Sequence, residues 1–194
     1  MTLLPLDIIP RKECCGCEAC ANICPKNCIV MQPDEQGFMR PKFDESLCIH
    51  CDLCRKACPI LGEKSIGITP KVIACKNRNN NIRSKSSSGG VFTALAEHII
   101  NDGGVVYGAA FNEQMEVEHQ RVDSIEGLSA LGGSKYTQSR IGDCLTRVKE
   151  DLRSGRQVLF TGTPCQIGGL QRFLGKVYDN LFALKLSVTE CRVR

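Results

Sequence analysis

Apolar and polar residues alternate along the second half of the chain in a pattern that predicts strands and helices in turn. Short apolar runs predict strands at 72–75, 105–111, 117–122, 157–161 and 181–186. Helical spacing predicts helices at 91–100, 125–131, 141–152 and 164–174. The buried stripes expected on two of these helices are Val91, Leu95 and Ile99, and Ile141, Leu145, Val148 and Leu152. Such alternation indicates an α/β domain with a mostly parallel sheet.

The first 62 residues have a different sequence pattern, with cysteines, prolines and short apolar runs in place of helical periodicity. Residues 29–31 and 37–39 predict a short hairpin across the polar stretch 33–36. Residues 63–70 read as a linker, because glycine, charge and proline replace any periodic pattern there. We therefore expect one domain over 1–62, a linker over 63–70 and the α/β domain over 71–194.

Cysteine is the outlier in the composition, with 14 among 194 residues. The run C-x2-C-x2-C-x3-C-P occurs twice, and this spacing is that of bacterial ferredoxins, in which the fourth cysteine binds the other cluster. The repeat therefore predicts an α+β ferredoxin-like dicluster module with two [4Fe–4S] clusters. The expected ligands are Cys14, Cys17, Cys20 and Cys58 for one cluster, and Cys48, Cys51, Cys54 and Cys24 for the other.

Zinc and disulfides are the alternative uses of so many cysteines. Zinc favours separated ligand pairs, four ligands to a site, which fits two runs of four poorly. Disulfides need an oxidising compartment, but the opening MTLLPLDIIP has no basic start and no long apolar stretch. We therefore expect a cytoplasmic protein without a membrane span. Cys15 and Cys28 are surplus; we expect small buried residues beside a cluster, with a ligand exchange at Cys15 as the alternative.

The net charge of +4 does not predict a nucleic-acid partner. Two clusters with four thiolates each would add roughly −4 and bring the total to about zero, and the basic residues are scattered. His50, His98 and His119 show no partner pattern, so we expect ordinary surface or packing roles. Cys75 and Cys144 are expected as core thiols, one in a strand and one in a helix.

Three stretches of the second half suggest a cofactor site. Residues 86–90 (SSSGG) precede a helix, where small residues and the helix N-terminus favour an anion such as phosphate. Residues 161–166 (TGTPCQ) follow an expected strand, with Thr163 as a helix cap and Pro164 at the first helical position. Residues 132–139 (GGSKYTQS) offer a lysine and hydroxyls. Each stretch is also compatible with an ordinary turn and cap.

Together, SSSGGVFTALAEHII, GGSKYTQSRIG and VLFTGTPCQIGGL resemble the coenzyme F-420 hydrogenase/dehydrogenase beta subunit family, and the doubled cysteine motif resembles its dicluster members. The resemblance implies an iron–sulfur flavoprotein oxidoreductase that passes electrons between the clusters and FAD or FMN. A deazaflavin-type carrier or a redox partner protein would exchange electrons with it. The flavin-site residues that it implies are Ser88, Gly89, Gly90, Lys135, Gln166 and Cys165. It names no catalytic acid or base.

The end of the chain departs from the family. Members continue with Cys-His-Gly-Val-Pro after the strand at 181–186, whereas this chain reads SVTECRVR from Ser187. Codons for Ser-Val-Thr-Glu-Cys-Arg, read two bases later, can encode the family segment, so we expect an out-of-frame, truncated ending in which Cys191 is no ligand. Truncation would weaken flavin binding and activity. The alternative function is therefore a non-catalytic ferredoxin-like carrier, or an electron-input module for a partner enzyme.

Overall fold

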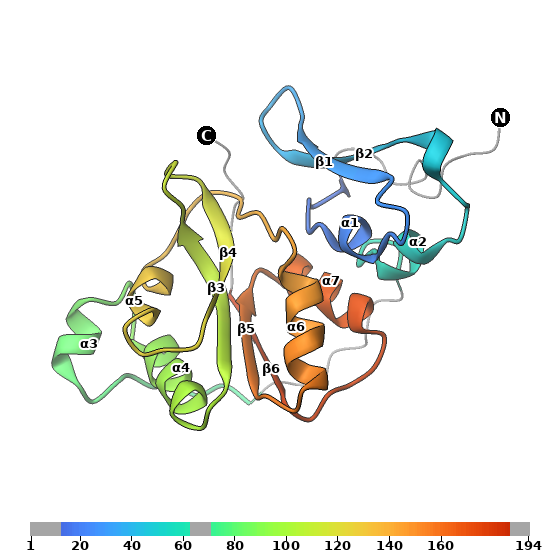
Figure 1. Cartoon of the computed structure of the whole chain (residues 1–194). Helices are drawn as coiled ribbons and strands as arrows, with labels where there is room; N and C mark the ends of the chain where they lie inside the picture. Colours follow the sequence, from blue (N-terminus) through green and yellow to red (C-terminus); the bar gives the residue numbers. More distant parts are fainter. Residues whose placement is uncertain (1–12, 63–70, 187–194) are drawn as a thin grey trace.

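The structure is a computed structural model that describes residues 13–62 and 71–186 (Figure 1). The expected linker at 63–70 and the expected out-of-frame tail from Ser187, with Cys191, lie outside the described residues. The N-terminal part is a small α+β unit, and the C-terminal part is a sheet with helices on both faces. This bears out the mixed α/β content that the sequence predicts.

A short antiparallel hairpin forms one layer of the N-terminal unit. Strands β1 (Ile29–Pro33) and β2 (Met39–Phe43) pair with Ile29 opposite Phe43 and Pro33 opposite Met39. The carboxylate of Asp34 shapes the turn, because it accepts the backbone N–H of Gln36 at 3.0 Å and that of Phe38 at 2.9 Å. The expected hairpin is confirmed, but its second strand begins at Met39, where the sequence predicted that it would end.

The cysteine repeat gives the same backbone twice. Helix α1 (Ala19–Ile23) begins after Glu18 at φ 59° and ψ 5°, and helix α2 (Leu53–Ala57) begins after Asp52 at φ 59° and ψ 9°. Both residues are left-handed, a conformation that is uncommon for residues other than glycine. Each helix ends at the fourth cysteine of its run, Cys24 or Cys58, in extended backbone. A 3-10 turn, η2 (Glu45–Leu47), precedes the second run.

The C-terminal sheet has four strands in the order β4-β3-β5-β6. Strand β3 (Val105–Phe111) pairs parallel with β5 (Val158–Gly162), which pairs parallel with β6 (Leu181–Lys185). Strand β4 (Val117–Val122) returns antiparallel to β3. The mostly parallel sheet is confirmed, and each of these strands lies within a residue or two of its predicted position.

Helices cover both faces of this sheet. Helices α4 (Val91–Asn101) and α5 (Leu128–Leu131) pack with Val106 and Leu159 on one face. Helices α6 (Cys144–Arg153) and α7 (Pro164–Leu174) pack with Tyr107 and Phe160 on the other. Alternate residues of a strand point to opposite faces, so each strand serves both layers.

The two predicted helix stripes fare differently. The stripe that α6 and its preceding turn were expected to bury is confirmed: Ile141, Leu145, Val148 and Leu152 are all buried. The stripe predicted for α4 is confirmed at Ile99 but wrong at Leu95, which is 40% exposed, while Ala96 is buried and Phe92 packs beside it. Helix α4 is rotated so that this small and aromatic edge faces the sheet.

The strand predicted at 72–75 is also wrong. Val72 and Ile73 are 91% and 67% exposed, and Cys75 is exposed and not a core thiol. The backbone just after this segment bonds to the Ser/Gly loop at 86–90 and not to a strand: the N–H of Asn77 donates to the carbonyl of Gly89 at 2.7 Å. The short helix α3 (Asn80–Ser84), which the sequence pattern did not predict, follows this segment and is capped by the Asn79 side chain.

Helix α7 joins the N-terminal unit to the sheet, since it packs against α1 and α2 (Figure 1). A methyl group built on Gly169 would lie 3.1 Å from the Ala19 Cβ and 3.2 Å from the Cys17 Sγ. Contacts that short leave no room for a larger residue, so Gly169 permits the close approach of the two modules.

Candidate iron–sulfur centres

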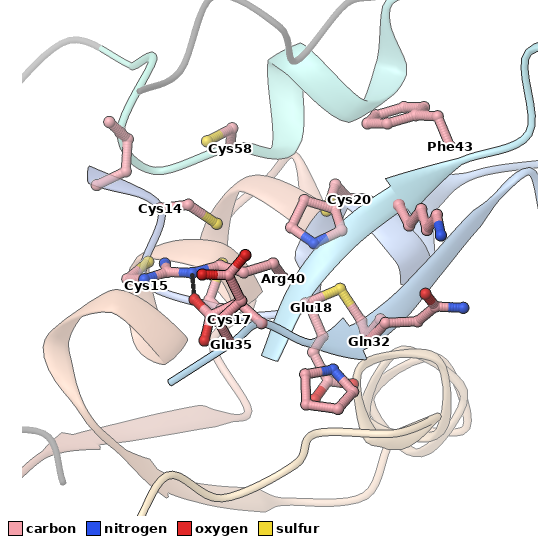
Figure 2. Close-up of a pocket in the computed structure, with 17 residues that line it drawn as sticks. Cys14, Cys15, Cys17, Glu18, Cys20, Gln32, Glu35, Arg40, Phe43 and Cys58 are labelled. Carbon is pink, nitrogen blue, oxygen red and sulfur yellow. Dashed lines mark hydrogen bonds and ion pairs between the residues drawn. The ribbon is translucent and has the colours of Figure 1, made fainter. Parts of the chain in front are cut away.

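Two cavities in the N-terminal module are lined by cysteines. The first has a volume of about 600 Å³ and lies against the β1–β2 hairpin, and Figure 2 shows several cysteine sulfurs around it. Its motif cysteines are Cys14, Cys17, Cys20 and Cys58. The second cavity is narrower, and its motif cysteines are Cys24, Cys48, Cys51 and Cys54. Each cavity therefore gathers three cysteines of one run and the fourth cysteine of the other.

The donor set fits a pair of [4Fe–4S] clusters, with four thiols around each cavity. Burial, followed by the neighbouring thiols of Cys14 and Cys58, raises the pKa of Cys20 to about 12. Burial likewise raises the pKa of Cys54 to about 11. Iron would remove these protons, as metals do when thiols bind them. The assignment of individual ligands stays a prediction.

Among residues 13–62 and 71–186, no group of three or more His, Cys, Asp or Glu side chains is arranged to hold a single metal ion. A cubane holds its four thiolates at the corners of a larger tetrahedron than one ion does.

The two surplus cysteines lie beside the cavities. Cys28 is buried at the second cavity, and its Sγ lies 3.3 Å from the Sγ of Cys24. Burial and the Cys24 thiol raise the pKa of Cys28 to about 12. Burial acts against ionisation of Cys24 too, but the hydrogen bonds from Cys28 and from backbone N–H groups outweigh it and lower that pKa. Cys15 lines the first cavity.

A buried carboxylate fixes the first cysteine loop to the second module. Glu18, 4% exposed, accepts the backbone N–H of Ile141 at 3.1 Å and that of Gly142 at 3.0 Å. The Asn22 side chain adds a bond to the Gly142 carbonyl at 2.8 Å. Burial raises the pKa of Glu18, although the two backbone donors and the charge of Arg140 oppose the rise. Sequence reasoning missed this contact, for which the only signal is an acidic residue inside each run.

The segment 132–142 connects several parts of the molecule. The Gln138 side chain accepts the Met39 N–H at 2.9 Å and donates to the Cys15 carbonyl at 3.4 Å. At the other end, the N–H of Ser134 donates to the Ser87 hydroxyl at 2.8 Å. This segment therefore joins the ferredoxin-like module, through Gln138, to the Ser/Gly loop at 86–90.

The structure brings some of the implied flavin-site residues together. Gly90 caps α4 in the left-handed conformation, at φ 72°, and Ser88 and Gly89 precede it in the same loop. Lys135 follows Ser134 directly in the sequence, but its ammonium group does not reach the 86–90 loop and is bonded to nearby backbone carbonyls. Lys135 Nζ donates to the carbonyls of Ala130 at 3.1 Å and Gly132 at 2.6 Å, and burial lowers its pKa.

Cys165 and Gln166 lie in the first turn of α7, which follows β5. The Gln166 side chain accepts the Thr163 N–H at 2.9 Å and completes a capping box, so Thr163 and Pro164 hold the helix-start positions expected of them. Its amide donates to the Ser139 hydroxyl at 2.9 Å. The Cys165 Sγ lies 3.0 Å from the Thr163 hydroxyl. Gln166 thus ties α7 to the 132–142 segment.

His119 has a packing role, one of the two roles expected from the sequence, but the sequence did not predict its partners. It is 6% exposed, stacks on Phe160, and pairs through Nε2 with the Thr161 carbonyl at 3.0 Å and through Nδ1 with Ser139 at 3.2 Å. Because a carbonyl only accepts, Nε2 carries the proton and Nδ1 accepts from the hydroxyl. Burial lowers the pKa of His119 to about 4, so the ring is neutral. Cys144, by contrast, is buried as expected.

Known proteins match both halves of the chain. Residues 13–60 match the 4Fe–4S dicluster domain, and residues 72–146 match the N-terminal region of the coenzyme F420 hydrogenase/dehydrogenase beta subunit. An uncharacterized ferredoxin of Methanocaldococcus jannaschii is 31% identical over 78 residues, which are 40% of this chain and 94% of that protein. An uncharacterized protein of the same organism is 25% identical in an alignment 210 positions long, which covers 90% of this chain and 56% of that protein.

A chain from the F420-reducing [NiFe] hydrogenase complex of Methanosarcina barkeri aligns with 47% of this chain and 32% of its own, at 24% identity and a TM-score of 0.39. This chain therefore spans little more than half of its longer curated relative and about a third of the hydrogenase chain. The ferredoxin-type match supports iron–sulfur electron transfer. With both matches in this order, the chain carries a 4Fe–4S dicluster domain ahead of a region similar to the N-terminal part of the coenzyme F420 hydrogenase/dehydrogenase beta subunit, and the two matches together support that family.

Proposed function

We propose that the chain relays electrons between a redox partner and its own α/β domain. Two [4Fe–4S] clusters, each of which changes by one electron at a time, supply the redox chemistry when bound. The observation that carries the proposal is the cross-paired lining of the two cavities. Cys14, Cys17, Cys20 and Cys58 would hold the first cluster, and Cys24, Cys48, Cys51 and Cys54 the second.

The two sets of four cysteines differ in their surroundings, and this difference indicates which cluster would face the α/β domain and which would face an outside partner. Cys17, from the first quartet, is buried and lies against Gly169 of α7. Cys51, from the second quartet, is exposed. The second site is therefore the one that meets an outside partner, and the first site is the one that faces the α/β domain.

The family's name points to a deazaflavin-type carrier, and FAD or FMN in the α/β domain is the finer part of the proposal. Two positions support it. Cys165 and Gln166 follow the carboxyl end of the parallel strand β5, where ligands of α/β proteins commonly bind. Ser88, Gly89 and Gly90 form the loop before α4. The segment 132–142 contacts both places and the first cysteine loop.

A second candidate function is a non-catalytic carrier, or an electron-input module for a partner enzyme. One observation favours it: the polar groups of Lys135 and Gln166 are bonded to the protein's own backbone and side chains. No helix within the described ranges could cross a bilayer. Reduced thiols suit a reducing compartment, and we propose the cytoplasm.

Anaerobic purification tests the proposal. We expect about eight iron and eight sulfide per chain, the content of two cubanes. Acid release followed by chromatography then measures flavin. One flavin per chain supports the oxidoreductase, whereas iron and sulfide without flavin support the carrier. Material that contains zinc and no acid-labile sulfide would refute both.

A further inference from the structure

Basic residues are scattered over most of the chain but gather in one stretch of the α/β domain. There is no Asp or Glu between residues 71 and 96, whereas five basic residues lie between 71 and 85. Four of the five are exposed, Arg83 is partly buried, and no carboxylate among the described residues forms an ion pair with any of them. We call this set the basic surface: Lys71, Lys76, Arg78, Arg83 and Lys85.

Hydrogen bonds hold most of the basic surface on one folded segment. The N–H of Asn77 donates to the Gly89 carbonyl at 2.7 Å, and its side-chain amide donates to the Gly90 carbonyl at 3.2 Å. The Arg83 guanidinium donates to the Asn77 carbonyl at 3.4 Å. The segment therefore lies against the loop before α4, and Figure 1 shows its helix α3 at the edge of the α/β domain, away from the N-terminal unit.

Apolar side chains accompany the charge. Val72 and Ile73 are 91% and 67% exposed and stand between Lys71 and Lys76 in the sequence. Exposed apolar groups flanked by charges suit a protein–protein contact, in which apolar burial supplies affinity and the charges select the partner. A nucleic-acid backbone would use the cations but leave the two apolar side chains in water. These observations favour a protein partner over a nucleic acid.

We propose that the basic surface docks a small acidic ferredoxin, the redox partner at the α/β end of the relay. Charge complementarity is the argument for this class of partner. The chain's own ferredoxin-like module shows the charge that such a protein carries, because residues 13–62 contain seven acidic and five basic residues and two bound clusters would add roughly −4. A separate ferredoxin of this kind is therefore anionic and complements the five cations.

The purpose of this docking rests on the proposed relay, and the position fits it. The Ser87 hydroxyl, next to the basic surface, accepts the Ser134 N–H at 2.8 Å, and Gln138 of the same 132–142 segment donates to the Cys15 carbonyl. A ferredoxin bound here lies at the end of that segment away from the cysteine loops, and exposed Cys51 stays accessible to a second partner. Docking itself requires neither flavin nor electron transfer, so it is measured independently of the relay.

Anaerobic titration calorimetry of the full chain tests the docking, with a small acidic 2[4Fe–4S] ferredoxin as the probe. We expect binding at about 0.02 M salt that is largely lost at about 0.5 M, where the charges are screened. Lys76→Glu with Arg78→Glu should weaken binding by about tenfold, and the same pair changed to Gln by less. Arg153→Glu with Lys176→Glu, a matched reversal of exposed cations at α6 and beyond α7, should bind like the unaltered chain.

Val72→Ser tests the apolar part of the contact. It should weaken ferredoxin binding by roughly tenfold and leave the binding of poly(U) RNA unchanged. The melting temperature of each variant verifies its fold.

Three results would overturn the proposal: no binding at low salt, equal affinities in the two charge-reversal variants, or tighter binding of poly(U) than of the ferredoxin. Self-association of the chain through the basic surface, measured by sedimentation, would give that surface to a second copy and also overturn it. Iron and sulfide are measured on the same samples. Failure of the relay shows in those contents, whereas failure of the docking shows in the titration with the contents intact.

Discussion

The Glu18 carboxylate accepts the backbone N–H of Ile141 at 3.1 Å, across the junction between the cysteine-rich module and the α/β domain. Its other oxygen accepts the N–H of Gly142 at 3.0 Å. The loop between Cys17 and Cys20 thus supplies the acceptors for two backbone N–H groups that lie just before α6 in the sequence. Buried donors without such acceptors would cost free energy, so the carboxylate holds the first cysteine loop in place.

Replacement of Glu18 by Gln should loosen this junction. The glutamine amide supplies one acceptor oxygen where the carboxylate supplies two, so one buried N–H loses its partner at a cost of about 2 kcal/mol. We expect faster hydrogen exchange in peptides that cover residues 138–142. Glu45→Gln, at an exposed position of the same module, is the control. Unchanged exchange at 138–142 in the Glu18 variant would contradict the assigned role.

Gly169→Val should separate the modules from the other side. A Cβ there already meets the Ala19 Cβ at 3.1 Å and the Cys17 Sγ at 3.2 Å, and valine adds two further methyl groups. We expect overpacking to cost roughly 1–3 kcal/mol and the occupancy of the first cluster to fall. Iron per chain measures this, with exposed Gln171→Ala on the same helix as the control. Full iron content with an unchanged melting temperature would show that the contact is loose.

Stability should decrease as the pH falls below neutrality because of His119. Burial lowers its pKa from 6.5 to about 4, so the unfolded chain binds a proton between these values that the native chain does not bind. The native state therefore loses stability as the pH falls through this window, by at most roughly 3 kcal/mol.

The melting temperature at pH 7.5 and pH 5 measures this loss. His119→Gln should show a smaller decrease over that range than the unaltered protein. His98→Gln, whose side chain is 72% exposed, should behave like the unaltered protein. Equal decreases in all three would mean that His119 does not supply the pH dependence.

Local signals in the sequence predicted most of the secondary structure. Ile141, Leu145, Val148 and Leu152 are spaced so closely to the helical period that one face must be buried, and this face is. Thr163 before a proline marked the start of α7, because a hydroxyl cap and a missing N–H both suit a helix N-terminus. The spacing of the cysteines likewise indicated which four motif cysteines line each cavity.

Long-range contacts decided what the sequence could not show. Residues 72–75 have a strand-like pattern, yet Val72 is exposed because the backbone that follows bonds to the Ser/Gly loop. His119 lies on β4, an edge strand whose sequence is mostly polar. Its neighbours Phe160 and Ser139 are distant in the sequence and come together only in the folded chain. Glu18 finds its partners more than 120 residues away, and no local pattern encodes that distance.

Pairs of Cys→Ala substitutions test the cross-ligation of two clusters most directly. If the fourth cysteine of each run binds the other cluster, Cys14→Ala with Cys58→Ala removes two ligands of one cluster, and about half of the iron and sulfide should remain. Cys14→Ala with Cys24→Ala then removes one ligand from each cluster, and nearly all iron should be lost. The opposite outcome, with half the iron kept in the Cys14–Cys24 pair and almost none in the Cys14–Cys58 pair, would contradict the account.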